Sequence, residues 1–170
     1  MGSGVDPGSP LRLLLRCPRT ARPVWTVARG AGMIERMFEA KRFTREPSPI
    51  MLMRVADELP AIQRGWDHFE NLVGLRGRKF YGVVDEKAGE YHLCTAPRSD
   101  DPSDHFGLEI GELAGGAYLR AVLQGEPPAI YEHIGPTARH LHTMATADDA
   151  RHDVEFYRRH DEIEIWMPVR

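Results

Sequence analysis

Hydrophobic residues along the chain recur with the two periods that distinguish helices from strands. Residues 50–55 form a short apolar run, which predicts a buried strand. A helix is predicted next, because Pro60 suits a first helical turn and Gly74 suits a C-terminal cap. Two strand-like runs at residues 78–84 and 90–95 then predict a hairpin. The apolar stripe of the helix consists of Ile62, Trp66, Phe69 and Val73.

The same order of elements recurs in the second half of the chain. A strand, a helix interrupted near Gly135-Pro136, and two closing strands are predicted at 116–123, 129–144, 153–158 and 162–169. We therefore expect an α+β fold of two pseudo-symmetric strand-helix-strand-strand units, at residues 50–97 and 115–170. Their antiparallel sheets are expected to pair across a pseudo-two-fold axis around a central ligand cleft.

Residues 1–32 show neither period and carry five arginines against one acidic residue, Asp6. The segment is too interrupted for a signal-peptide core and lacks the amphipathic pattern of a transit peptide. We expect it to be a disordered leader, or an extension that is not native to the domain. The folded domain is then predicted to span residues 33–170.

Composition excludes several classes of protein. The chain has 42% hydrophobic and 28% charged residues, which is typical of one globular domain. Beyond residue 32 acidic residues outnumber basic ones, so direct nucleic-acid binding is not expected. No apolar run is long enough to span a membrane, and two cysteines suggest a cytoplasmic protein without a disulfide framework. No metal or other cofactor is expected, because no His or Cys pair has ligand spacing.

Alternation in the last two strands places carboxylates beside aromatic rings. Glu164 and Trp166 share one strand face with Glu162, and Glu155 shares a face of the preceding strand with Tyr157. An organic cation gains Coulomb attraction from such a carboxylate and roughly 0.5–2 kcal/mol from each well-placed ring face. This pattern predicts a partner that is a small aromatic or cationic molecule.

Three stretches resemble the GyrI-like small-molecule-binding family, which includes effector-binding domains of multidrug-responsive regulators. The last segment, residues 155–169, is similar to the family's closing hairpin with its Glu-x-aromatic-x-Pro-aliphatic strand. That pattern is fitted by Glu164, Trp166, Pro168 and Val169. Two further stretches resemble the corresponding parts of family members, namely residues 78–82 with 90–91, and residues 115–118. The resemblance therefore covers about residues 50–170.

The resemblance implies an aromatic-walled pocket with a glutamate between the two halves, which takes flat, apolar and often cationic molecules. The alternative that it implies is an enzyme, since some stand-alone members are hydrolases of cyclopropane-bearing DNA-alkylating natural products. Nothing before residue 50 looks like the helix-turn-helix of the regulators. A stand-alone binding domain is therefore expected, without a direct role in transcription.

Candidate site residues follow from these two arguments. A carboxyl group held among aromatic rings loses hydration, which raises its pKa toward neutrality and suits it to acid–base chemistry. We expect Glu155 or Glu164 to supply the carboxyl group. A hydrogen-bonding hydroxyl is expected from Tyr157, Tyr81 or Tyr131, and further ligand-binding rings from Tyr118, Trp166 and Trp66.

Each of these residues also has a plain structural interpretation. Glu162 and Glu164 on a half-exposed strand are typical of a solvated surface, and Glu155 is equally compatible with surface and pocket. Trp66 suits an ordinary core position. Three functions therefore remain open: a binder of drugs or toxins, which we favour, a hydrolase that uses Glu and Tyr as acid and base, and a protein-interaction domain such as a topoisomerase inhibitor.

Overall fold

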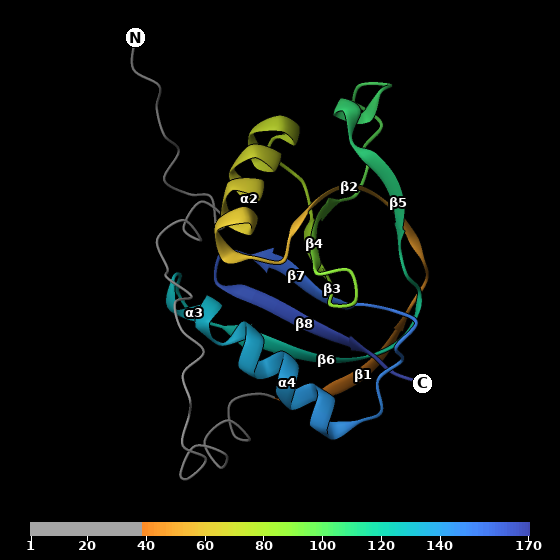
Figure 1. The fold of residues 1–170 in the computed structure, drawn as a ribbon, viewed down its shortest axis with the longest axis vertical. Helices are drawn as coiled ribbons and strands as arrows, with labels where there is room; N and C mark the ends of the chain where they lie inside the picture. Colours follow the sequence, from red (N-terminus) through yellow and green to blue (C-terminus); the bar gives the residue numbers. More distant parts are fainter. Residues whose placement is uncertain (1–38) are drawn as a thin grey trace.

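The computed structural model describes residues 39–170, in which eight antiparallel strands form one continuous sheet with the helices on one face (Figure 1). The strand order is β1-β6-β8-β7-β3-β4-β2-β5. The strands are β1 Lys41–Arg45, β2 Ser48–Ala56, β3 Phe80–Asp85, β4 Glu90–Thr95, β5 Glu109–Leu113, β6 Gly116–Gln124, β7 Asp153–Arg159 and β8 Glu162–Pro168. The helices are α2 Leu59–Val73, α3 Ala129–Glu132 and α4 Ile134–Met144, and a short 3-10 turn, η2, covers His105–Gly107. The predicted leader at residues 1–32 lies outside the described residues.

The duplicated architecture is confirmed. The first half supplies β2-α2-β3-β4 and the second half β6-α3-α4-β7-β8, so the α+β prediction is correct. Leu52 pairs with Cys94 and Val122 pairs with Glu164, so equivalent positions lie 70 residues apart (52 to 122 and 94 to 164). The interruption predicted near Gly135-Pro136 is present as the break between α3 and α4.

Each half also begins with a strand that the hydrophobic pattern does not predict. β1 precedes the first unit but pairs with β6 of the second, and β5 precedes the second unit but pairs with β2 of the first. Where the two connections cross, Gly115 lies against Pro47, and a Cβ atom at Gly115 would be 2.5 Å from Pro47 Cδ. Arg45 Nη1 donates to the carbonyl oxygens of Leu113 (3.2 Å) and Ala114 (3.1 Å). This crossing ties the two ends of the sheet together and helps to curl it.

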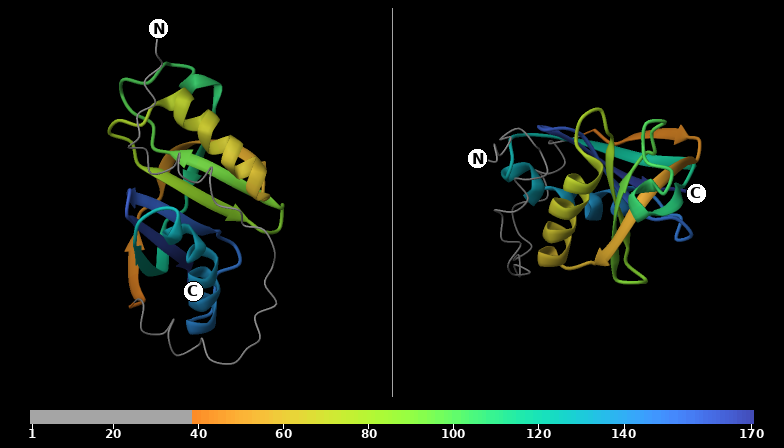
Figure 2. Two further views of the ribbon diagram at one scale, coloured as in Figure 1. Left: turned by 90° about the vertical axis from the view of Figure 1, so that its left-hand side faces the viewer. Right: turned by 90° about the horizontal axis from the view of Figure 1, so that it is seen from above.

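The curled sheet has a helix-covered face and a concave face. α2 lies over the sheet of the first half, and α3 and α4 lie over that of the second (Figure 2). Phe80 and Tyr157 belong to the core beneath the helices, whereas Tyr81 and Phe156 face the concave side. Each large apolar side chain buried in these cores contributes about 1.5–3 kcal/mol. The concave core consists of Ile50, Leu52, Tyr81, Val83, Cys94, Leu113, Tyr118, Val154 and Trp166.

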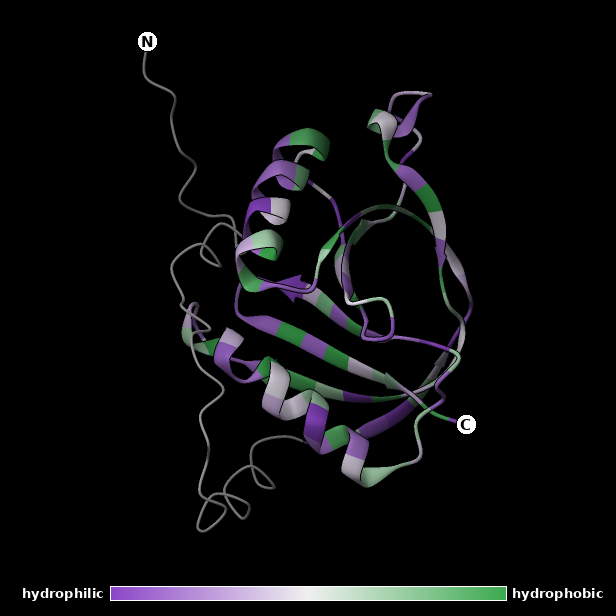
Figure 3. Ribbon diagram, viewed as in Figure 1, coloured by the Kyte–Doolittle hydropathy of each residue, from purple (hydrophilic) through white to green (hydrophobic). Residues whose placement is uncertain are grey.

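The alternation of polar and apolar residues in β8 predicted that its polar side chains face solvent, but they do not. Hydrophilic and hydrophobic residues alternate along this strand (Figure 3). Such alternation normally indicates one solvated face. Glu164 is nevertheless 3% exposed, because β8 lies in the interior of the sheet and side chains cover both of its faces.

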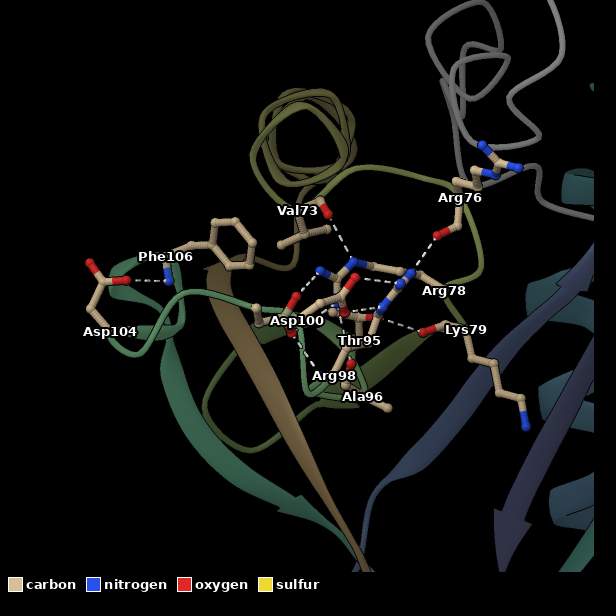
Figure 4. A network of polar contacts seen from close by, with 11 residues as sticks. Val73, Arg76, Arg78, Lys79, Thr95, Ala96, Arg98, Asp100, Asp104 and Phe106 are labelled. Carbon is tan, nitrogen blue, oxygen red and sulfur yellow. Dashed lines mark hydrogen bonds and ion pairs between the residues drawn. The ribbon is translucent and has the colours of Figure 1, made fainter.

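A buried ion pair fixes the loop after β4 to the end of α2 (Figure 4). Arg78 pairs with Asp101, and their side chains are 4% and 3% exposed. Arg78 Nε also donates to the carbonyl oxygen of Val73 (2.8 Å). The Arg78 guanidinium holds the pKa of the Asp101 carboxyl below its usual range through this hydrogen-bonded pair.

No helix in the described part of the chain is long and apolar enough to cross a membrane.

Candidate functional site

A buried carboxylate lies between the sheet and α2. Glu155 in β7 is 7% exposed, and its Oε2 atom accepts hydrogen bonds from Tyr91 Oη and Tyr157 Oη, each at 2.7 Å. The two hydroxyl oxygens are 3.2 Å apart. Tyr91 comes from β4 and Tyr157 from β7, so the first and second halves meet at this carboxylate.

Gly82 creates the space in which Tyr91 reaches Glu155. Gly82 in β3 pairs with Glu155 on one side and with Leu93 on the other. A Cβ atom at this position would overlap the hydroxyl group of Tyr91 and lie 3.2 Å from Glu155 Oε2. Glycine in the interior of a strand often marks such a close approach. The Tyr91 hydroxyl therefore lies over the bare backbone of β3.

Aromatic rings enclose the carboxylate from the α2 side. The ring of Trp66 lies 5.5 Å from that of Tyr157, 6.4 Å from that of Tyr91 and 6.0 Å from that of Phe80, all nearly edge to face. Trp66 is 1% exposed, and its Nε1 atom has no hydrogen-bond partner within residues 39–170. We call Trp66, Tyr91, Glu155 and Tyr157 the helix-side cluster.

The helix-side cluster is unusual in its electrostatics. No arginine, lysine or histidine of the described chain forms an ion pair with Glu155. Burial raises the pKa of Tyr91 well above its usual range, and the charge of Glu155 and the neighbouring Tyr157 add to this effect. Tyr91 therefore stays protonated and donates to the carboxylate. The arrangement can stabilise an organic cation, or hold a proton between a carboxylate and two phenols.

The other predicted carboxylate, Glu164, lies on the concave face and is already paired. Its Oε2 atom accepts from Trp166 Nε1 (2.8 Å) and lies 3.5 Å from Arg120 Nη1, while its Oε1 atom lies 3.2 Å from Arg158 Nη1. Two guanidinium groups therefore offset the charge of this carboxylate, and an incoming cation would have to compete with both.

The predicted site residues thus divide between the two faces of the sheet. Trp66, Glu155 and Tyr157 come together in the helix-side cluster. Tyr131 in α3 is 3% exposed and belongs to the same helix-covered core. The concave face holds Glu164, Trp166, Tyr81 and Tyr118.

Two residues that complete the cluster were not predicted as site residues. Nothing in the sequence around Tyr91 distinguishes a tyrosine of the core from one with a functional role. Gly82 did carry a signal, because a glycine within the run Phe80–Val84 indicates a close approach. Periodicity does not show which side chain makes that approach.

No metal-binding group was found in the part of the chain that the structure describes. Among those residues, no three or more His, Cys, Asp or Glu side chains are arranged to hold a metal ion.

Comparison with known proteins shows the fold. No protein-family model matches this sequence, and no curated protein sequence is similar to it. An integron cassette protein from the mobile metagenome of Vibrio cholerae has a similar structure, with a TM-score of 0.61 and 18% identity over 78% of this chain and 97% of that one. SAV2435 bound to tetraphenylphosphonium gives a TM-score of 0.54 and 17% identity over 78% and 94% of the two chains. The C-terminal domain of EcmrR gives 0.51 and 10% identity over 79% and 98%.

These likenesses show a shared fold, and that fold is consistent with the GyrI-like resemblance of the sequence. At such low identities they do not show membership of the family, which stays a prediction.

Proposed function

We propose that this protein binds bulky lipophilic organic cations, with Glu155 as the charge that selects them. The observation that carries the proposal is a buried carboxylate whose two close partners are phenolic hydroxyl groups. Tetraphenylphosphonium, the ligand in the structure of SAV2435, is a molecule of this class.

Glu155 differs in its partners from two other buried carboxylates, Asp101 and Glu164. Asp101 pairs with Arg78, and Glu164 pairs with Arg120 and Arg158. An ionised carboxylate is costly to bury unless a positive charge or several hydrogen bonds compensate it. Glu155 has hydrogen bonds but no cationic partner among residues 39–170, so a bound cation would complete its compensation.

The chemistry of the surrounding rings favours a cation without hydrogen-bond donors. Such a cation does not compete with the tyrosine hydroxyls for the Glu155 carboxylate, and it gains about 0.5–2 kcal/mol from each ring face that it contacts. Trp66, Tyr91 and Tyr157 supply these faces in the helix-side cluster. The proposed ligand is therefore a flat or globular arylated cation.

Binding requires a local movement, because Trp66 and Glu155 are 1% and 7% exposed. Displacing the Trp66 indole breaks no hydrogen bond described in the structure, although it gives up the packing of that ring. The ligand therefore exchanges places with the indole beneath α2, and part of its binding free energy offsets that displacement.

Isothermal titration with tetraphenylphosphonium and with neutral triphenylphosphine oxide tests the proposal. The wild-type protein should prefer the cation, and Glu155→Gln should weaken cation binding by about tenfold or more while leaving the oxide unaffected. Glu46→Gln, an exposed site in the β1–β2 turn with the same change of charge, is the matched control. Equal affinity of the wild-type and Glu155→Gln proteins for the cation would overturn the proposal.

A hydrolase that acts on cyclopropane-bearing natural products is the second candidate, and the Glu155–Tyr157 contact favours it. A carboxyl group 2.7 Å from a tyrosine hydroxyl supplies the acid and base that ring opening requires. Incubation with a cyclopropane-bearing indole alkaloid, followed by mass spectrometry, distinguishes the two functions. A binder saturates stoichiometrically, whereas a hydrolase yields the water adduct and loses that activity in Tyr157→Phe.

A further inference from the structure

A histidine–carboxylate pair lies next to Glu155 on the helix-covered face of β7. His142 in the last turn of α4 and Asp153 at the start of β7 form this pair, with Nε2 of the imidazole 2.7 Å from Oδ2 of the carboxylate. Asp153 precedes Glu155 by two residues. Side chains two residues apart on a strand share one face and lie about 7 Å apart. The pair therefore stands close to the carboxylate of the proposed cation site.

The pair lies at the margin of the core, where water reaches it. The side chain of His142 is 43% exposed and that of Asp153 is 20% exposed. Burial raises the pKa of the Asp153 carboxyl, the hydrogen bond with His142 opposes this rise, and the charges of Glu86 and Glu155 add to it. The charges of Asp153 and Glu155 therefore influence each other, although their carboxyl groups have different hydrogen-bond partners.

The net charge of the pair changes by one unit across neutral pH. Histidine is the side chain whose charge ordinarily changes between pH 5 and 8. While His142 is protonated, its charge offsets that of the Asp153 carboxylate, and a positive charge is also favourable in the last turn of α4. When His142 loses its proton, the negative charge of Asp153 is no longer offset.

Other charged groups border the pair from the β3–β4 turn and from the loop before β7. They are Asp85, Glu86, Lys87, Asp148, Asp149, Arg151 and His152. Carboxylates, lysine and arginine ordinarily keep their charge between pH 6 and 8. The backbone N–H of Ala88 lowers the pKa of Asp85, and the hydrogen bond from Arg151 lowers that of Asp148, so these two carboxylates are ionised throughout that range.

His152 is the bordering group that shares the titration range of His142. Its Nε2 atom lies 3.8 Å from Asp85 Oδ2. Asp85 shares a strand face with Val83 of the concave core, so this second pair belongs to the opposite side of the sheet from Glu155. On α4 itself, Arg139 precedes His142 by about one turn, is exposed and keeps its charge. The charge that changes on the helix-covered face beside Glu155 is therefore that of His142.

We propose that the His142–Asp153 pair makes cation binding at Glu155 depend on pH, so that a lipophilic cation binds more tightly at pH 8 than at pH 6. This inference rests on the proposed function. At pH 8 the carboxylate of Asp153 adds a second negative charge about 7 Å from that of Glu155, within the Debye length of about 8 Å at 0.15 M salt. By linkage, the bound cation promotes loss of the proton from His142 by the same factor.

A second histidine–carboxylate pair of similar exposure supplies the matched control. His160 Nε2 lies 3.6 Å from Glu126 Oε2, and the side chain of His160 is 41% exposed. His160 follows Glu155 by five residues, which corresponds to about 16 Å along a strand and to about twice the Debye length at 0.15 M salt. A change of charge at His160 should therefore have no effect on a cation at Glu155.

Isothermal titration with tetraphenylphosphonium at pH 6 and at pH 8, in about 0.15 M salt, tests the inference. The wild-type protein should bind the cation about threefold more tightly at pH 8. His142→Gln should bind it equally at both pH values, with the affinity of the wild-type protein at pH 8, because Asp153 is then never offset. His160→Gln should keep the wild-type dependence on pH.

Two further measurements show that charge is responsible. Asp153→Asn at pH 8 should bind the cation about threefold more weakly than the wild-type protein, because the amide removes the negative charge that the inference requires. Neutral triphenylphosphine oxide should bind the wild-type protein equally at both pH values.

The possible failures of this inference and of the proposed function are distinguishable. Equal affinity of the wild-type protein for the cation at pH 6 and pH 8, or an undiminished dependence on pH in His142→Gln, would refute the role of the pair. Either result leaves the proposed function intact if Glu155→Gln still weakens cation binding. If Glu155→Gln binds the cation as the wild-type protein does, the proposed function fails and this inference fails with it.

Discussion

Removing one hydroxyl group from the helix-side cluster should destabilise the protein far more than removing one from the concave face. Tyr91→Phe keeps the buried ring but deletes the oxygen that donates to Glu155 Oε2 at 2.7 Å. A hydrogen bond to a charged group contributes about 1.5–3 kcal/mol, and the carboxylate that loses it stays buried. We expect a loss of about 2 kcal/mol in the free energy of unfolding, which corresponds to a fall in Tm of about 4–8 °C for a chain of this length.

Tyr81→Phe is the matched control for this prediction. Tyr81 is also buried, and its ring stacks on Phe156 at 4.9 Å, but its hydroxyl forms no hydrogen bond described within residues 39–170. Its removal should change the unfolding free energy by less than about 0.5 kcal/mol. Equilibrium unfolding in urea, with equal m values for all variants, gives both numbers.

A double-mutant cycle extends the same measurement. Tyr91→Phe and Tyr157→Phe remove donors that share one acceptor atom, so their effects should be non-additive by more than about 0.5 kcal/mol. The reasoning fails if Tyr91→Phe and Tyr81→Phe are equally mild, because Glu155 would then not depend on its phenolic partners.

Three further predictions concern stability and access. Gly82→Ala should destabilise the protein by about 1–3 kcal/mol in urea unfolding, because the new methyl group overlaps the Tyr91 hydroxyl; a neutral result would contradict the close approach. Asp101→Asn should cost about 3–5 kcal/mol, because it leaves Arg78 buried and unpaired. The pKa of Asp101 is lower in the folded state, so its contribution is present above the unfolded-state pKa and is lost as pH falls through the folded-state pKa; this acid dependence should be weaker in Asp101→Asn. Trp66→Ala should lower stability by about 3–5 kcal/mol yet strengthen tetraphenylphosphonium binding, because the ligand no longer displaces the indole; weaker binding, seen by titration calorimetry, would refute this route of entry.

Local patterns in the sequence were sufficient to predict the duplicated unit and the faces within single strands. Glu155 and Tyr157 share a face, as do Glu164 and Trp166, because side chains alternate along any strand. Alternation within one strand does not show how the faces of that strand match the faces of the neighbouring strands. The sequence therefore could not show that Glu155 faces α2 whereas Glu164 faces the concave side.

The features that the sequence did not predict depend on contacts between residues that are far apart in the chain. β1 and β5 are polar edge strands that pair with the opposite half, so their own residues carry little of the hydrophobic signal that marks a strand. The arginines that neutralise Glu164 come from neighbouring strands whose register only the folded chain defines. The role of Tyr91 likewise depends on the approach of its hydroxyl group to the backbone of Gly82 in the neighbouring strand.

The most direct test of the central claim is the indole ¹H–¹⁵N spectrum of the protein during titration with tetraphenylphosphonium. Trp66→Phe and Trp166→Phe assign the two resonances from the two faces of the sheet. The account predicts a saturable shift of the Trp66 signal and no change at Trp166, because the cation enters beneath α2 beside Glu155. A shift of the Trp166 signal with Trp66 unchanged would contradict it and would place the cation on the concave face.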